Sequence, residues 1–320
     1  MKSSRILYID FIKVLAMFIV TIGHCAQSLS LQIFPDKVIP SDFFVTIHMP
    51  LFMIASGYVL NFEKMRQIPL NAYVYNKFKR LIIPLFFWLI IYSLFTIRIL
   101  SVSEIFNIYW YLFALFLSLI VLRLFSSFIK NDIVLLVLSL LFVLIVPLFK
   151  ISHTNFMFPF LIYGYLLKRY IDKINVAYAI LLGGAFLIIY ATIWNVSHTV
   201  YLSPLNMLAI DCGMIKSFLI RLVIGVVGST CLYLIICRLQ SKHFIKQISK
   251  YGRYTLIFYT MTTVINGFTS RLFSYLNFSI QNPILLETLS IVFAFVQMYL
   301  IYKFAKRFEN NKRFKLLLGI

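Results

Sequence analysis

The chain has 320 residues, of which 62% are hydrophobic and 12% are charged, and its mean hydropathy is +0.92. A soluble domain carries charges on about 25% of its residues, so this composition excludes an ordinary soluble globular protein. The net charge of +20 does not indicate nucleic-acid binding, because the sequence offers no soluble basic domain to carry it. The composition predicts an all-α polytopic membrane protein, since a helix satisfies its own backbone hydrogen bonds in hydrocarbon.

About ten apolar stretches approach or reach the roughly 20 residues that a membrane helix needs. Charges in the opening MKSSRILYID interrupt the apolar run of a signal peptide, so the first stretch is expected to be a retained helix. The sixth stretch is short and is expected to be tilted, re-entrant or longer than its apolar run. In chain order the predicted spans are 6–27, 43–62, 81–100, 105–124, 132–149, 156–167, 175–195, 216–237, 255–276 and 284–303.

Lysine and arginine residues orient these spans, because short cytoplasmic loops are enriched in them. With the N-terminus inside, 23 of the 30 Lys and Arg residues lie in inner segments, 5 in outer segments and 2 within spans. Both termini are therefore predicted to be cytoplasmic, and the positive charge reflects topology and contact with anionic lipid. Because no linker or long loop is present, residues 1–320 are predicted to form a single transmembrane domain without a soluble domain.

The first span carries a stripe of polar residues, which are functional candidates because their burial in a membrane is costly. Asp10 and Lys13 are three residues apart and can pair on one helical face. His24 follows Asp10 by fourteen residues and returns to within about 40° of that face. Asp10, Lys13, Met17 and His24 are therefore expected to point into the bundle. The alternative is a structural stripe that satisfies its own hydrogen bonds.

The second span places His48 a little over one turn from its outer end, at about the depth of His24. Imidazole suits general-base chemistry near neutral pH, so two histidines at one depth could share a proton or cradle an acceptor hydroxyl. The alternative is that His48 binds a backbone carbonyl freed by Pro50. Ser56 and Gly57 favour close helix packing over a nucleophilic serine, and the sequence has no GxSxG elbow.

Three basic residues, Lys77, Lys79 and Arg80, precede Pro84 at an inner membrane boundary. Alone they are more typical of positive-inside anchoring. The functional alternative is a clamp for the phosphates of an anionic cytoplasmic molecule. A further cation, Arg221, lies one turn inside the eighth span and is expected to extend outward.

Together these residues resemble the acyltransferase-3 family of membrane-bound O-acyltransferases, which includes polysaccharide and fucose O-acetylases. The likeness covers nearly the whole chain, with one departure near the C-terminus, where Thr262 follows Tyr259 at the place of an expected histidine. The matching elements are Arg5-x4-Asp10-x2-Lys13-x6-Val20-x3-His24, His48-Met49-Pro50-Leu51-Phe52 with Ser56-Gly57-Tyr58, Lys77-x2-Arg80-x3-Pro84, and Trp110-Tyr111-Leu112-x-Ala114-Leu115.

The resemblance implies an enzyme of the bacterial cytoplasmic membrane that moves an acetyl group from cytoplasmic acetyl-CoA to a sugar hydroxyl of a cell-surface or lipid-linked polysaccharide. It implies that His24 is a general base or a transient acyl carrier, with Asp10 and His48 as further catalytic candidates. The expected donor-binding residues are Lys77, Lys79, Arg80 and Arg5, of which Arg5 also supports the charge balance of the first span. Acetyl-CoA acts as a substrate, and neither a resident cofactor nor a metal site is expected.

Two other classes of protein remain compatible with ten spans. A transporter or flippase would move a lipid-linked glycan without modifying it, and a scaffold would use none of the candidate residues. The histidine stripe combined with the inner basic residues favours the enzyme.

Overall fold

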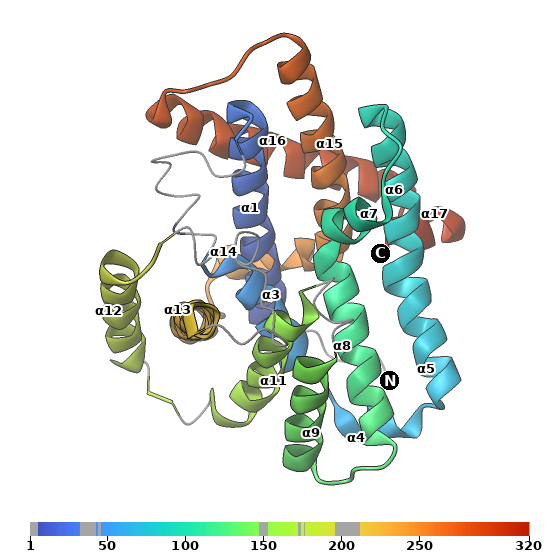
Figure 1. The fold of residues 1–320 in the computed structure, drawn as a ribbon, viewed down its shortest axis with the longest axis vertical. Helices are drawn as coiled ribbons and strands as arrows, with labels where there is room; N and C mark the ends of the chain where they lie inside the picture. The colour runs from blue at the N-terminus through green and yellow to red at the C-terminus, as the bar shows by residue number, and fades with distance from the viewer. Residues whose placement is uncertain are drawn as a thin grey trace. The chain divides into compact units, whose positions relative to one another are not determined.

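The computed structural model describes residues 6–32, 43, 46–146, 153–171, 174–175, 177–195 and 212–319 (Figure 1). Within these ranges every regular element is helical, which confirms the all-α prediction. The chain divides into two compact units. The first unit comprises Met1–Met49, Ile83–Leu100 and Ile236–Ile320, and the second comprises Pro50–Ile82 and Ser101–Ile235.

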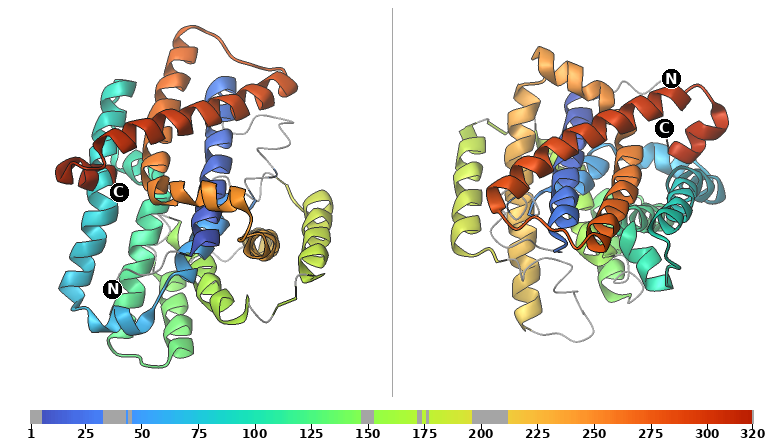
Figure 2. Two further views of the ribbon diagram at one scale, coloured as in Figure 1. Left: turned by 180° about the vertical axis from the view of Figure 1, so that it is seen from behind. Right: turned by 90° about the horizontal axis from the view of Figure 1, so that it is seen from above.

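The first unit is organised around α1 (Leu7–Ser30), which is buried along most of its length and contacts α14, α15 and α16. Its residues at 12, 16 and 17 are fully buried, as expected for the apolar side of a central helix. Figure 2 shows α16 crossing α1 and α15 obliquely. The remaining helices of this unit are α6 (Ile83–Thr96), α14 (His243–Ser249), the 3-10 helix η4 (Lys250–Tyr254), α15 (Thr255–Tyr275), α16 (Pro283–Phe308) and α17 (Lys312–Leu318).

In the second unit, α8 contacts α4, α5, α7, α9 and α11. Two helices cross the division between the units: α3 begins with two residues of the first unit, and α13 ends in it. The helices are α3 (His48–Tyr58), α4 (Phe62–Gln67), α5 (Leu70–Lys77), the π-helix η1 (Phe78–Ile82), α7 (Val102–Ile108), α8 (Trp110–Ser126), α9 (Asp132–Ile145), α11 (Thr154–Tyr170), α12 (Ala177–Thr192) and α13 (Cys212–Arg238).

Two glycines bring α3 and α11 into backbone contact. A Cβ built on Gly57 would lie 1.9 Å from the Leu161 carbonyl oxygen, and one built on Gly164 would lie 2.1 Å from the Ile54 carbonyl oxygen. No larger residue fits either position without separating the helices. The predicted close packing at Gly57 is therefore confirmed, with Gly164 as its counterpart on α11.

The basic element before Pro84 winds as a π-helix, and the proline gives a physical reason. Proline has no amide hydrogen, and in a regular α-helix its ring would clash with the carbonyl of Arg80, four residues earlier. A wider turn over Phe78–Ile82 separates these groups without ending the helix. Lys79 and Arg80 are thus carried on the π-helix, directly after Lys77 at the end of α5.

Among the described residues, four helices are long and apolar enough to cross a membrane: Leu7–Ser30, Leu70–Thr96, Ile215–Arg238 and Pro283–Phe308. A helix overlaps each of the ten predicted ranges, although α3 occupies only 11 residues of the second. The sixth is longer than its apolar run, because α11 covers Thr154–Tyr170. The number of crossings and the side on which the termini lie stay predictions.

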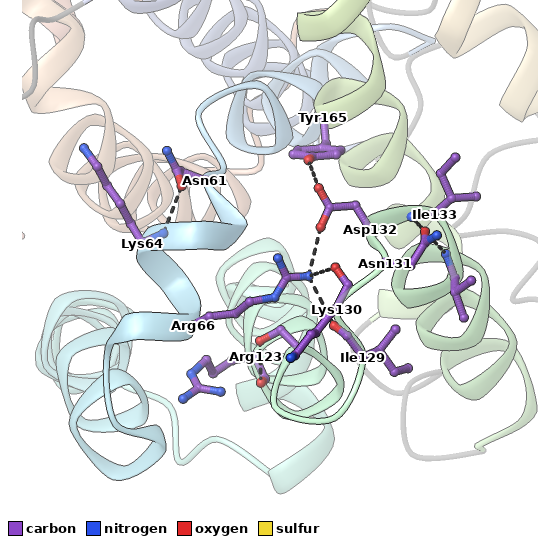
Figure 3. Close-up of polar contacts among 12 residues, drawn as sticks. Asn61, Lys64, Arg66, Arg123, Ile129, Lys130, Asn131, Asp132, Ile133 and Tyr165 are labelled. Carbon is purple, nitrogen blue, oxygen red and sulfur yellow. Dashed lines mark hydrogen bonds and ion pairs between the residues drawn. The ribbon is translucent and has the colours of Figure 1, made fainter.

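Asp132, at the start of α9, joins three helices of the second unit through its two carboxylate oxygens (Figure 3). Arg66 of α4 donates to Oδ1 at 2.9 Å. From α11, Tyr165 and Arg169 donate to Oδ2 at 2.6 and 2.9 Å. These charge-assisted bonds stabilise the packing of α4, α9 and α11, and no local pattern around Asp132 predicts them.

Candidate active site

The start of α1 is held closely by α14 and η4. Asp10 lies 3.9 Å from Lys13 Nζ, which confirms that this pair can form on one helical face. A Cβ on Gly252 of η4 would come within 2.5 Å of Asp10 Cβ, so only glycine fits beside this carboxylate without displacement. Ser249 of α14 donates a hydrogen bond of 2.7 Å to the Leu7 carbonyl. The position of Asp10 is therefore fixed from two neighbouring elements.

His24 is half-buried on α1, one turn before Gln27. Its Nδ1 lies 3.1 Å from the amide oxygen of Gln27. Because an amide oxygen can only accept, this contact places the proton on Nδ1 and leaves the lone pair on Nε2. An imidazole held in this tautomer can take a proton or attack a carbonyl carbon through Nε2.

Gln27 was not among the predicted site residues, although its spacing from His24 offered a signal. Residues three apart on a helix are neighbours, and glutamine is an uncommon choice for the interior of an apolar span. The prediction of this stripe rested on ionisable side chains, and Gln27 carries no charge, so the amide beside the ring was missed.

The turn that carries His24 is tied to α15 and α16. Ser28 Oγ lies 2.8 Å from the His24 carbonyl oxygen and 3.0 Å from the Asn266 carbonyl oxygen, within donating distance of both. Asn266 and Gln297 pair through their amides, at 3.1 Å for the Gln297 donor and 3.4 Å for the Asn266 donor. Both amide side chains are buried, so this pair of hydrogen bonds satisfies amide groups whose burial without a partner would be costly in an apolar interior.

His48 is the first residue of α3 and is half-buried. Its predicted match in depth to His24 stays a prediction. Pro50 occupies the third position of α3, where a helix does not use the amide hydrogen of the residue. The catalytic and the structural interpretations of His48 both stay predictions.

The predicted donor-binding residues belong to the second unit, apart from Arg5, which lies outside the described residues. Lys79 and Arg80 are exposed on the π-helix, and Lys77 is half-buried with Nζ 5.1 Å from the centre of the Tyr73 ring. The ring of Phe78 packs edge-on against Phe116 of α8, with centroids 6.5 Å apart. This contact anchors the π-helix and leaves its two cations accessible.

Comparison with known proteins connects these features to a family. A family model described as an acyltransferase domain matches residues 6–303. The nodulation protein NolL of Mesorhizobium japonicum is 30% identical over 185 residues, which cover 52% of this chain and 49% of that protein. NolL of Sinorhizobium fredii is 28% identical over 188 residues, which cover 53% of this chain and 51% of that protein.

The chain thus spans about half the length of the curated relatives it matches. No solved structure matches it. The match to the family model contains the Asp10–Lys13 pair, His24, the π-helix and the glycine contact between α3 and α11. On this evidence the chain belongs to the acyltransferase-3 family.

Proposed function

We propose that this protein is a membrane-embedded O-acyltransferase of the bacterial cytoplasmic membrane. In this proposal it moves an acetyl group from cytoplasmic acetyl-CoA to a sugar hydroxyl of a cell-surface or lipid-linked polysaccharide. Membership of the acyltransferase-3 family supports the reaction class. The observation that carries the proposal is the contact of 3.1 Å between His24 Nδ1 and Gln27, which leaves Nε2 available for chemistry.

His24 can act in either of two ways, and both use the Nε2 lone pair. As a general base, Nε2 takes the proton of the sugar hydroxyl while the hydroxyl oxygen attacks the thioester carbon. The C–S bond breaks, and the proton passes to the departing CoA sulfur. As an acyl carrier, Nε2 first attacks the thioester carbon and releases CoA as a thiolate. The sugar oxygen then takes the acetyl group from Nε2, and the hydroxyl proton is transferred to the CoA sulfur.

The remaining predicted residues have supporting roles in this proposal. Lys77, Lys79 and Arg80 bind the CoA phosphates at the inner boundary. Lys79 and Arg80 are exposed on the π-helix, and Lys77 directly precedes it, so the three cations suit charge-assisted bonds. Arg5 contributes positive charge near the start of the first span. Asp10 holds the start of α1 through Lys13 and Gly252.

Mass spectrometry of surface glycan tests the proposal in a strain that lacks the gene. Loss of one acyl mass per repeat, restored by the wild-type gene, is the expected result. Loss of the entire polymer would favour the transporter, because an enzyme that only decorates the glycan is not needed for its export. An unchanged glycan would contradict both.

A further inference from the structure

Arg221 is a buried cation within one of the most apolar helices of the chain. Its side chain is 3% exposed, and it lies in the part of α13 that is long and apolar enough to cross a membrane. The expectation that it extends outward was wrong. Its guanidinium carbon lies 4.7 Å from the centre of the Phe156 ring on α11, and this cation–π contact holds it inside. Charged residues in such positions mark binding sites by default, because their burial is costly.

His153, directly before α11, lies close enough to Arg221 to interact with its charge, and Trp110 of α8 contacts His153. His153 precedes α11 with a left-handed backbone (φ 53°), and its ring lies edge-on to Trp110, with centroids 5.2 Å apart. Burial, followed by repulsion from Arg221, lowers the pKa of His153 to about 4. At neutral pH His153 is therefore uncharged, and Arg221 supplies the positive charge of this cluster.

Asn155 adds an independent sign of a ligand. Its side chain is buried, and its Oδ1 accepts a hydrogen bond of 2.9 Å from the Phe156 amide. Its Nδ2 is also buried but has no hydrogen-bond partner within the described ranges. Buried amide donors are rarely left without an acceptor. This donor lies one residue from Phe156, whose ring contacts the Arg221 guanidinium. A guanidinium and an unsatisfied N–H donor are both groups that a carboxylate or phosphate oxygen would satisfy.

We propose that Arg221, Asn155, His153 and Trp110 form a binding site for an anionic group of the acceptor glycan. This inference rests on the proposed function, because only that proposal identifies the acceptor as a glycan. In the predicted topology Trp110 and Arg221 lie near the outer ends of their spans, and His153 and Asn155 lie in the outer segment before the sixth span. This is the side of an extracytoplasmic acceptor. The anion is either a sugar carboxylate or the phosphate of a lipid-linked glycan, and both present oxygens to the same donors.

Binding by the full chain in phosphatidylcholine nanodiscs, followed by microscale thermophoresis, tests this site. The probes are a tetrasaccharide containing glucuronic acid, its carboxyl-reduced counterpart, farnesyl phosphate and farnesol. We expect one charged probe to bind at least tenfold more tightly than its neutral counterpart, which also identifies the source of the anion. Arg221→Gln should remove that preference, whereas Arg98→Gln, the same change at an exposed arginine of the first unit, should preserve it.

Two further variants keep the test decisive if Arg221→Gln does not fold. Asn155→Asp retains the oxygen that accepts from Phe156 but replaces the N–H donor with negative charge, so it should weaken binding at least tenfold. Arg221→Lys should retain part of the preference. Equal binding of charged and neutral probes, binding of neither charged probe, or unaffected binding in both Arg221→Gln and Asn155→Asp would overturn the inference.

Acetyl transfer in cells, scored in parallel, separates the two proposals. Transfer by a wild-type protein that binds neither charged probe would contradict the acceptor site alone. Selective anion binding by a protein that transfers no acetyl group would contradict the proposed function alone.

Discussion

Gly252 lies so close to Asp10 that a Cβ built on it would come within 2.5 Å of Asp10 Cβ and 2.9 Å of Asp10 Cα. We expect Gly252→Ala to push η4 away from α1 and to lower the stability of the protein by about 1–3 kcal/mol. Thermal unfolding in detergent measures the change. Gly184→Ala in α12 is the matched control, because nothing lies within 4 Å of a Cβ there. Equal melting temperatures for the two variants would show that η4 adjusts freely.

His24 is expected to be essential for acyl transfer and dispensable for folding. Its alanine variant loses the contact with Gln27, about 1–3 kcal/mol, which a protein of this size should tolerate. Loss of a general base lowers rates by about 10²–10⁴, and loss of an acyl carrier lowers them more. Glycan acylation in cells and monodispersity after purification are the two measurements. Retained acylation would make His48 the next candidate for the catalytic residue, whereas an aggregated protein would indicate that His24 has a structural role.

Gln27→Leu should lower acyl transfer by about tenfold to a hundredfold while leaving the amount of folded protein unchanged. Leucine has a similar size but cannot accept from His24 Nδ1, so the ring loses its fixed tautomer. Gln67→Leu, at an exposed residue of α4, makes the same chemical change away from the stripe. Full activity in Gln27→Leu would show that the tautomer of His24 is set by another group.

Lys77→Ala combined with Arg80→Ala should weaken binding of acetyl-CoA. A charge-assisted contact contributes about 1.5–3 kcal/mol, so each lost contact corresponds to roughly a tenfold to hundredfold rise in Kd. Calorimetry with purified protein gives the value. The double variant Lys242→Ala with Lys246→Ala removes two exposed cations, one directly before α14 and one within it, and should not change the Kd. If both double variants bind alike, the cations near the π-helix serve only as membrane anchors.

The topology is open to a direct test. Reporter fusions at Lys37 and at the C-terminus should report opposite sides of the membrane, because 23 of the 30 Lys and Arg residues lie in inner segments of the predicted topology. Fusions that report the same side would contradict the arrangement of ten spans.

Features encoded within one helix were predictable from the sequence. Apolar length located a helix in each predicted range, and the spacing of Asp10 and Lys13 predicted their pairing. Close packing at Gly57 was predictable as well, because glycine disfavours the helical conformation and its main use in a membrane helix is to let another helix approach closely. The pairing of Gly57 with Gly164 was not predictable, since the sequence does not show which helix packs against α3.

Features that depend on a second element were missed or predicted wrongly. The outward extension of Arg221 was inferred from its own helix, whereas the ring that retains it belongs to α11. The amide pair of Asn266 and Gln297 joins α15 to α16 and has no local sequence signal beyond two polar residues in apolar spans. Pairings of this kind need the three-dimensional arrangement.

The π-helix over Phe78–Ile82 has a consequence for comparing relatives. A π-turn holds one residue more than an α-turn, so it is equivalent to inserting one residue into a helix that remains continuous. Deleting one residue there would turn Lys77 by about 100° about the helix axis relative to the residues after Pro84, with composition and hydropathy almost unchanged. Two relatives that share the basic residues but differ by one position in this turn would direct their cations differently. An alignment gap of one residue at this point is therefore a change of geometry.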